Sequence, residues 1–320
     1  MGELDLIASF EELLESRGER LVRGPGDDAS VVRARKFAVT SIDAVSDGVH
    51  FRLDTHSPAD VGHKALATAR SDLGAMGADA GEAHVALALP SGFDAAAARE
   101  LVAAMEALAA RHGVVIAGGD VIRAACLTVT VCVTGWADDE RMLVGRDGVQ
   151  PGHDLWVTGE LGAATAGLLI LEKGIAAPEA DRLLDRHRRP EPRLAAGAAL
   201  ARAGAAAMID LSDGLATDAR HLAERSGCAI TIELARLPIA AGVEAVASAA
   251  GRDPLELAVS GGDDYELLVA AAPERGRDLE RAAADAGTTL TRLGRAEAGT
   301  GVVLRTAAGG TLAITGYEHE

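Results

Sequence analysis

The stretch SPADVGHKALATARSDLGAMGADAGEAHVALAL, residues 57–89, predicts a helix followed directly by a strand. Ser57 and Pro58 are typical of a helix N-cap and a first helical residue. Apolar residues then recur at helical spacing until Gly77, where we expect the helix to end. The apolar run 83–89 has the length of a buried strand. A helix joined to a strand in this way indicates a layered architecture, either α/β or α+β.

The alternation of strands and helices continues on both sides of this stretch. We expect strands at residues 37–42, 83–89, 114–117, 127–135, 154–158, 207–211, 229–233, 258–259 and 266–271. We expect further helices at residues 94–112, 163–172, 193–203, 215–225 and 274–286. The length of 320 residues suits two domains, and the polar stretch after Ala137 divides them into residues 1–137 and 138–320. Each half contains an apolar run that ends in Gly-Gly-Asp, at 116–120 and 259–263, which leaves an internal repeat open.

The charge balance limits the partners of this chain. It has 31 basic and 48 acidic residues, a formal net charge of −17. This excess of negative charge argues against binding to nucleic acid or to an anionic membrane. Aromatic residues make up 2%, too few for a platform on which bases stack. An acidic protein can still bind a polyphosphate when metal cations stand between its carboxylates and the phosphate oxygens.

Cysteine usage and hydropathy bear on the compartment. Cys126, Cys132 and Cys228 form no C-x-x-C pair and indicate free thiols in a reducing environment. No segment has the roughly 18 uninterrupted apolar residues of a membrane span, and no signal-peptide pattern opens the chain. We therefore expect a soluble, cytoplasmic protein.

Several common catalytic motifs are absent from the sequence. It contains no G-x-x-x-x-G-K-[ST], no G-x-S-x-G and no H-E-x-x-H. Residues 24–29, GPGDDA, fit the loose dinucleotide pattern G-x-G-x-x-A. Two adjacent carboxylates in that turn would repel a pyrophosphate bound to bare amides, so this interpretation requires a metal ion.

Aspartates recur where predicted strands meet turns. They are Asp27, Asp28, Asp43, Asp120, Asp210, Asp213, Asp263 and Asp264, and Asp72 lies near the end of the helix that begins at Pro58. Each alone could be a turn former or a helix cap. Together they are expected to converge on one sheet edge, where like charges repel without cations. Hard oxygen ligands suit Mg²⁺, so the pattern predicts a polyphosphate site with several magnesium ions.

Six segments carry a resemblance to a known family. They are GPGDDASV (24–31), TSIDAVSDGVHF (40–51), KALATARSDLGAMGA (64–78), IAGGDVIR (116–123), IDLSDGL (209–215) and SGGDDYELL (260–268). In this order and spacing they resemble thiamine-monophosphate kinases. The resemblance implies ATP-dependent phosphorylation of thiamine monophosphate to thiamine diphosphate, the final step of thiamine diphosphate biosynthesis. It also implies a two-domain fold like that of aminoimidazole ribonucleotide synthetase, with an α/β N-terminal domain, an α+β C-terminal domain and a homodimer formed through the N-terminal sheet.

The resemblance also implies roles for individual residues. Magnesium-binding positions are Asp28, Ser41, Asp43, Asp72, Asp120, Asp210 and Asp213. Nucleotide-binding positions are Gly119, Asp120, Arg146, Ser212 and His112. Positions that contact thiamine monophosphate are His50, Asp263, Ile314 and Tyr317. Residues 1–137 would then bind ATP and magnesium and form the dimer, while residues 138–320 complete the active site.

Two departures from the family pattern stand out. Ile42 replaces a hydroxyl residue that many members have, which removes one possible side-chain ligand. Ile314 replaces a tryptophan that often lies against the thiamine rings, and Tyr317 is the substitute candidate.

The same fold supports two hypotheses about function besides that of a kinase. Aminoimidazole ribonucleotide synthetase is the enzymatic alternative, and a non-catalytic nucleotide-binding regulator is the alternative of another class. The sequence lacks the early reactive cysteine of selenophosphate synthetases and the terminal cysteine of hydrogenase-maturation relatives. For the kinase we expect direct in-line transfer, because the acceptor phosphate oxygen is already an anion. An aspartyl-phosphate intermediate is the rival mechanism.

Overall fold

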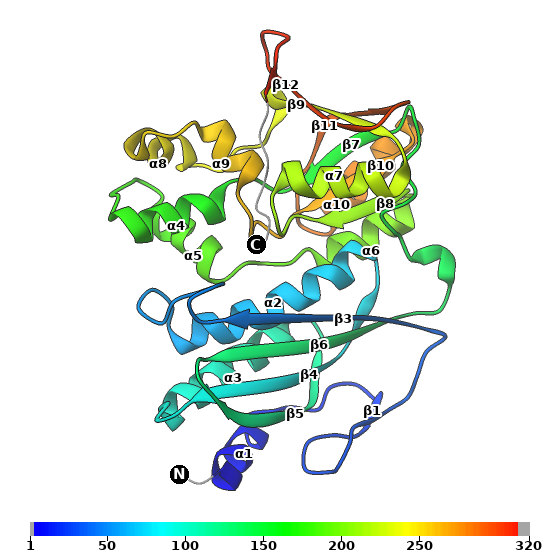
Figure 1. The fold of residues 1–320 in the computed structure, drawn as a ribbon. Coiled ribbons are helices and arrows are strands. Elements are labelled where there is room, and N and C mark those ends of the chain that lie inside the picture. The colour runs from blue at the N-terminus through cyan, green and yellow to red at the C-terminus, as the bar shows by residue number, and fades with distance from the viewer. Residues whose placement is uncertain (1–2, 313–320) are drawn as a thin grey trace. The chain divides into compact units, whose positions relative to one another are not determined.

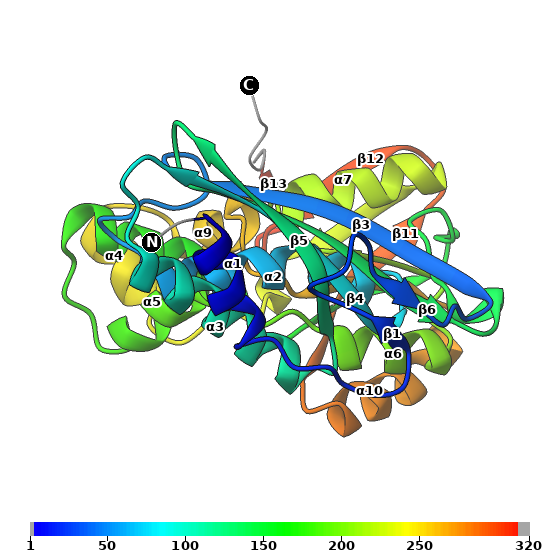
Figure 2. The ribbon, with the colours of Figure 1, turned by 90° about the horizontal axis from the view of Figure 1, so that it is seen from below.

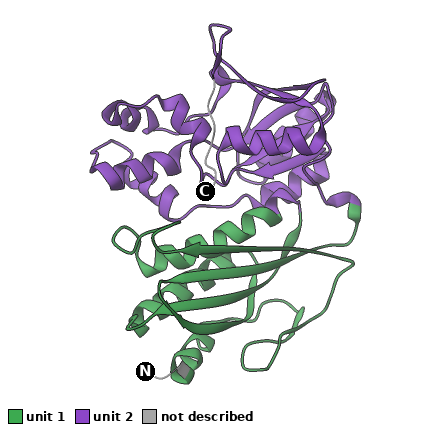
Figure 3. Cartoon of the chain, viewed as in Figure 1, with its two compact units in different colours: residues 1–73, 78–140 green, residues 74–77, 141–320 purple. Residues whose placement is uncertain are grey.

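The computed structural model describes residues 3–312 and forms two compact units (Figure 1, Figure 3). Unit 1 contains residues 1–73 and 78–140, and unit 2 contains residues 74–77 and 141–320. The division is therefore not a single cut in the sequence, because residues 74–77 group with the second half of the chain. Among residues 3–312, no helix is both long enough and apolar enough to cross a membrane.

Unit 1 is built on a four-stranded sheet with helices on one face (Figure 1). Its elements are α1 (Glu3–Glu11), β1 (Leu21–Arg23), β2 (Val31–Val32), β3 (Phe37–Ser46), α2 (Pro58–Ala75), β4 (Asp79–Pro90), α3 (Ala95–Arg111), β5 (Val115–Ala124) and β6 (Thr128–Ala137). The strand order is β3-β6-β4-β5, in which β4 and β5 are parallel and the other neighbours are antiparallel. The strands twist relative to one another (Figure 2).

The two faces of this sheet differ in burial. Val129, Val131 and Val133 on β6 are at most 1% exposed, while the residues between them are partly exposed. On β3, Ile42 is 66% exposed although it is large and apolar. Because successive side chains of a strand point to opposite faces, the helices cover the valine face and leave the Ile42 face open in this chain.

Unit 2 is built on a seven-stranded sheet of order β13-β12-β9-β11-β7-β10-β8. Its elements are β7 (Asp154–Thr158), α4 (Ala163–Lys173), α5 (Ala180–Arg188), α6 (Leu194–Ala203), β8 (Ala207–Asp210), α7 (Leu215–Ser226), β9 (Ala229–Glu233), α8 (Val243–Ala250), α9 (Pro254–Ser260), β10 (Leu267–Ala271), α10 (Gly276–Asp285), β11 (Leu290–Glu297), β12 (Gly301–Arg305) and β13 (Thr311–Leu312). Among the strands described in this sheet, between residues 154 and 312, only β9 and β12 are parallel neighbours. Single-turn 3₁₀ helices lie at Glu140–Met142, Leu234–Arg236 and Pro273–Arg275.

The sheet of unit 2 has a core on each face. Leu222 of α7 packs with Val157 and Ile209 on one face. On the other face, Leu200 of α6 and Leu279 of α10 pack in a second buried cluster. Both faces are therefore apolar, which explains why β7, β8 and β10 read as continuous apolar runs in the sequence.

The helix predictions are confirmed to within a few residues, and one strand prediction is wrong. Residues 258–259 belong to α9, whose first turn is capped by Asp253 accepting a hydrogen bond from the backbone N–H of Leu255 (2.9 Å). A pair of apolar residues has no period, so the cap signal and Pro254 were the better guide. The Gly-Gly-Asp motif at 116–120 lies within β5, whereas the one at 259–263 begins at the C-terminal end of α9 and continues into a loop. The two motifs are therefore not structural equivalents.

We expect Gly119→Ala to destabilise the protein and Gly118→Ala to have little effect. A Cβ added at Gly119 would lie 2.1 Å from the carbonyl oxygen of Val85 on β4, and one at Gly118 would meet no atom closer than 3.7 Å. Overpacking of this kind costs about 1–3 kcal/mol. Urea unfolding of the two variants measures the difference, and equal midpoints would contradict the close approach of β4 and β5 at Gly119.

Candidate functional site

A polar group lies on the covered face of the unit 1 sheet, between β3 and α2. The Ser41 hydroxyl donates a hydrogen bond to Oδ2 of Asp72. Asp43 follows Ser41 on the same face of β3. Burial, and then the negative charge of Asp72, raises the pKa of Asp43 to about 6. Two carboxylates and a hydroxyl thus lie together, as hard ligands of a divalent metal ion would.

The isoleucine at position 42 does not disturb this group. Its neighbours Ser41 and Asp43 point toward α2, while Ile42 points to the opposite, open face and is 66% exposed. The loss of a side-chain hydroxyl at position 42 therefore removes no ligand from the face that carries Asp43.

Asp120 lies on β5, which is the edge strand opposite β3 in the same sheet. Strand pairing leads from Asp120 through Ala86 and Thr130 to Ala44, the residue after Asp43. Three strand spacings separate β5 from β3, about 14 Å in total. Asp43 and Asp120 also lie within strands rather than at their ends, because β3 and β5 continue beyond them. The expectation that these two aspartates converge on one sheet edge is therefore wrong, and they cannot share a single metal ion within one chain.

Asp28 lies in the loop that joins β1 to β2 and is exposed. The neighbouring Asp27 accepts a hydrogen bond from Arg23 (2.7 Å). At the end of the loop, Ser30 Oγ lies 2.7 Å from His84 Nε2, which joins the loop to β4. The GPGDDAS loop is thus fixed at its end and presents its carboxylates to solvent.

The two predicted histidines take different positions in unit 1. His50 lies in the turn after β3, where its Nδ1 accepts a hydrogen bond from the backbone N–H of Ser46 (3.2 Å). His112 caps the C-terminus of α3 and precedes β5. Asp120 lies five residues after Val115 along β5, a distance of roughly 16 Å, so His112 and Asp120 are far apart in this unit.

A second acidic group lies at the end of β8 in unit 2. Asp210 ends the strand and Asp213 lies in the turn before α7. Asp218 of α7, which sequence reasoning missed, accepts a hydrogen bond from the backbone N–H of Asp213 (3.2 Å). Burial, and then the charges of Asp210 and Asp213, raises the pKa of Asp218 to about 8, and the nearby Arg146 opposes this effect. An acidic residue five positions after Asp213, in the first turn of the helix, was the available signal.

The segment that carries Asp263 pairs with the turn that carries Ser212. The backbone N–H of Asp263 donates to the carbonyl of Ser212 (2.9 Å), and that of Tyr265 donates to the carbonyl of Leu211 (2.9 Å). A Cβ added at Gly262 would lie 2.4 Å from the Ser212 carbonyl oxygen, so this position requires glycine. The structure therefore brings together three predicted site residues of unit 2, Ser212, Asp213 and Asp263.

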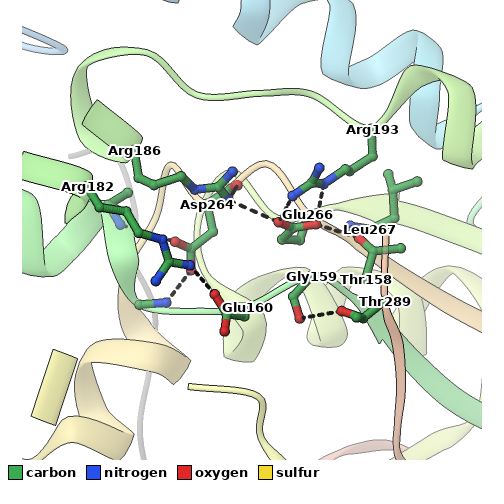
Figure 4. Close-up of polar contacts among 12 residues, drawn as sticks. Thr158, Gly159, Glu160, Arg182, Arg186, Arg193, Asp264, Glu266, Leu267 and Thr289 are labelled. Atoms are coloured by element: carbon green, nitrogen blue, oxygen red, sulfur yellow. Dashed lines mark hydrogen bonds and ion pairs between the residues drawn. The ribbon is translucent and has the colours of Figure 1, made fainter. Parts of the chain in front are cut away.

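Behind this segment lies a buried ionic network that sequence reasoning also missed (Figure 4). Glu266 is 0% exposed and accepts hydrogen bonds from Arg193 (2.7 and 2.6 Å), Arg186 (3.0 Å) and the Thr158 hydroxyl (2.7 Å). Asp264 accepts hydrogen bonds from the backbone N–H groups of Gly162 (2.7 Å) and Ala164 at the start of α4. Burial raises the pKa of Asp264 to about 7, partly offset by the Gly162 hydrogen bond. The carboxylates of Asp264 and Glu266 belong neither to the acidic group around Asp43 nor to the one around Asp213.

The acidic side chains of the predicted site are distributed over two groups rather than concentrated in one. Within residues 3–312, no three His, Cys, Asp or Glu side chains lie together as ligands of one ion. The carboxylates instead form the groups around Asp43 and around Asp213, one in each unit. Predicted substrate contacts at Ile314 and Tyr317 lie outside the described residues.

Comparisons with known proteins agree over nearly the whole chain. The N-terminal domain model of AIR synthase related proteins matches residues 26–137, and the C-terminal model matches residues 150–306. A thiamine-monophosphate kinase of Mycobacterium tuberculosis (strain H37Rv) is 40% identical over 273 residues, which is 83% of this chain and 80% of the relative. That of Escherichia coli (strain K12) is 36% identical over 300 residues, 92% and 90% of the two chains.

Solved structures show the same fold. Thiamine-monophosphate kinase from Stenotrophomonas maltophilia K279a has a TM-score of 0.83 at 33% identity, over 94% of this chain and 95% of that one. AaThiL complexed with AMPPCP and TMP has a TM-score of 0.79 at 30% identity, over 100% and 97%. Escherichia coli HypE, a hydrogenase maturation protein, matches at 18% identity with a TM-score of 0.80 over 100% and 98%, which shows the fold alone. With both domain models matched and curated relatives aligned over most of their length, this chain belongs to the thiamine-monophosphate kinase family of AIR synthase related proteins.

Proposed function

We propose that this chain transfers a phosphoryl group from ATP to thiamine monophosphate and releases thiamine diphosphate and ADP, as the final step of thiamine diphosphate biosynthesis. The observation that carries the proposal is the partly buried pair of carboxylates, Asp43 and Asp72, beside the hydroxyl of Ser41. A pair of this kind suits a divalent cation, which ATP brings with it. The complex of AaThiL with AMPPCP and TMP supports both substrates.

Direct in-line transfer is the proposed mechanism. The acceptor oxygen is already anionic, so the reaction requires alignment and charge neutralisation rather than a strong base. The proposed ligands of several magnesium ions are Asp28, Ser41, Asp43, Asp72, Asp120, Asp210 and Asp213. When bound, Mg²⁺ supplies positive charge that lessens the repulsion between donor and acceptor phosphates. Arg146, whose charge acts on Asp218, would add a fixed positive charge near the nucleotide.

The remaining assignments complete the proposal. Residues 1–137 would bind ATP and magnesium, and residues 138–320 would complete the site. Nucleotide contacts would come from Gly119, Asp120, Arg146, Ser212 and His112. Contacts to thiamine monophosphate would come from His50, Asp263, Ile314 and Tyr317. A cytoplasmic location stays a prediction.

ADP formation tests this function. We expect ADP only when ATP, thiamine monophosphate and Mg²⁺ are all present, and no ADP after chelation with EDTA. Asp72→Asn should lower kcat/KM by about 100-fold or more, because it removes a carboxylate ligand of the magnesium ion that would neutralise the phosphates. Asp54→Asn is the control, since Asp54 is an exposed carboxylate of the same unit that pairs with Arg52.

Three results would contradict the proposal. Turnover of an aminoimidazole ribonucleotide precursor in place of thiamine monophosphate would favour the synthetase. ATP binding without any turnover would favour a regulator. With chiral γ-phosphate on ATP, we expect inversion at phosphorus, and retention would favour an aspartyl-phosphate intermediate.

Asp43→Asn should raise the thermal stability of the metal-free protein at pH 8 and change it less at pH 4.5. The pKa of Asp43 is about 6 in the fold, above the ordinary value of 3.8. Its stabilising contribution is therefore complete below pH 3.8 and is lost as the pH rises through about 6. Melting curves in EDTA at both pH values measure the effect, and Asp54→Asn should show no such pH-dependent difference. An identical shift at both pH values would contradict the burial of a charged Asp43.

A homodimer formed through the unit 1 sheet is also part of the proposal. Ile42 and Ile122 are 66% and 50% exposed, and strand pairing puts both on the open face. Exposed apolar patches on sheets mark interaction sites. The row of Asp120, Ala86, Thr130 and Ala44 lies between them, so a dimer through this face would bring Asp120 to the subunit boundary.

Ile42→Asp should convert this dimer to monomers. The substitution puts a charge into the proposed apolar interface without touching the valine core. Light scattering measures the mass, and Leu4→Asp is the control because Leu4 is 79% exposed on α1, away from the sheet strands. A wild-type chain that is monomeric and fully active would contradict the proposed dimer.

A further inference from the structure

The segment between α9 and β10 has an unusual backbone. Among residues 3–312, the non-glycine residues with a positive φ are Asp263, at 67°, and Tyr265, at 49°. Residues other than glycine rarely adopt this left-handed backbone conformation, and it persists only where the surrounding structure fixes it. The backbone strain lies at Asp263, which is proposed to contact thiamine monophosphate, and at Tyr265.

Contacts on both sides of the segment hold this conformation. On one side, Asp263 and Tyr265 donate their backbone N–H groups to the turn after β8. On the other side, Asp264 is bound at the start of α4, and Glu266 is bound between Arg186 and Arg193. The side chains of Asp264 and Glu266 are both anchored in the interior, so the backbone between them cannot relax without breaking buried hydrogen bonds.

This backbone brings the side chains of Tyr265 and Asp263 together. The Tyr265 hydroxyl donates a hydrogen bond to Oδ1 of Asp263 (3.0 Å). Tyr265 is 6% exposed, so packing fixes its ring and makes the hydroxyl a donor in a constant position. Asp263 itself is only partly buried. A fixed donor on one carboxylate oxygen sets the plane of the group, and with it the direction in which the carboxylate accepts other hydrogen bonds.

We propose that Tyr265 is a positioning residue, which orients the Asp263 carboxylate toward the cationic thiamine portion of thiamine monophosphate. The inference rests on the function proposed above. Thiamine carries a positive charge and an amino group, and a carboxylate whose orientation is set in advance binds such groups at a lower entropic cost. In the proposed function Asp263 contacts the acceptor substrate, so we expect the effect of Tyr265 on thiamine monophosphate rather than on ATP.

Tyr265→Phe tests the inference, because it removes the hydroxyl and keeps the ring. We expect the KM for thiamine monophosphate to rise roughly tenfold, as the loss of a hydrogen bond to a charged group predicts. The KM for ATP, kcat and the melting temperature should stay close to wild type. Arg182→Gln is the control, because Arg182 pairs with Glu160 beside the network (Figure 4).

A double-mutant cycle separates positioning from a general structural effect. If Tyr265 acts through Asp263, then Asp263→Asn with Tyr265→Phe should have the same KM for thiamine monophosphate as Asp263→Asn alone. Additive effects, or a Tyr265→Phe enzyme that loses stability and affinity for both substrates equally, would overturn the inference. A wild-type KM in Tyr265→Phe, with normal wild-type turnover, would overturn the inference and leave the proposed function standing. Absence of wild-type turnover with thiamine monophosphate would instead overturn the proposed function.

Discussion

Much of unit 2 is organised around one buried carboxylate, that of Glu266. It joins the start of β10 to β7 through the Thr158 hydroxyl, to α5 through Arg186 and to the start of α6 through Arg193. Removing one partner of a buried ion pair typically costs about 3–5 kcal/mol, because the other charge is left without compensation. The network also restricts which residue can stand at position 159. A Cβ at Gly159 would lie 2.2 Å from Glu266 Oε1, so only glycine fits there. Four elements thus depend on a single side chain for their relative positions.

The carboxylates of the two acidic groups, around Asp43 and around Asp213, show the opposite energetic behaviour. Glu266 is neutralised by two arginines, whereas Asp43 and Asp218 have raised pKa values because burial and neighbouring carboxylates disfavour their charge. In a chain of net charge −17, such groups weaken the fold unless a cation binds to them. The fold therefore keeps destabilising charge where the proposed chemistry needs magnesium. The compensated charge of Glu266 lies in the framework behind Asp263.

Successive side chains of a strand lie on opposite faces of the sheet, so adjacent residues can have different roles. On β3, Asp43 points toward α2 and Ile42 points to the open face. One strand can therefore contribute to a polar site and to an apolar surface without conflict between them. This separation also explains why the isoleucine at position 42 is compatible with the magnesium ligands proposed at Ser41 and Asp43.

Signals that act over a few residues were readable in the sequence. Ser57 and Pro58 marked the start of α2, Asp94 the start of α3, and the continuous apolar runs marked β7 and β9 as strands. The motifs around Asp43, Asp72, Asp213 and Asp263 were sufficient to indicate the family. Where the sequence offered only a two-residue run, at 258–259, the prediction failed.

Tertiary structure alone decided what depends on residues far apart in the chain. The sequence could not show that Asp43 and Asp120 belong to opposite edge strands, since that follows from the order β3-β6-β4-β5. Nor could it show that Glu266 lies between Arg186 and Arg193, or that Asp218 faces Asp213. Helix caps and apolar periods arise from contacts between near neighbours, and any one of them can be recognised locally. Strand order, burial and the pairing of charges arise only when the whole chain has packed, because desolvation and electrostatic energy depend on every group that surrounds a side chain.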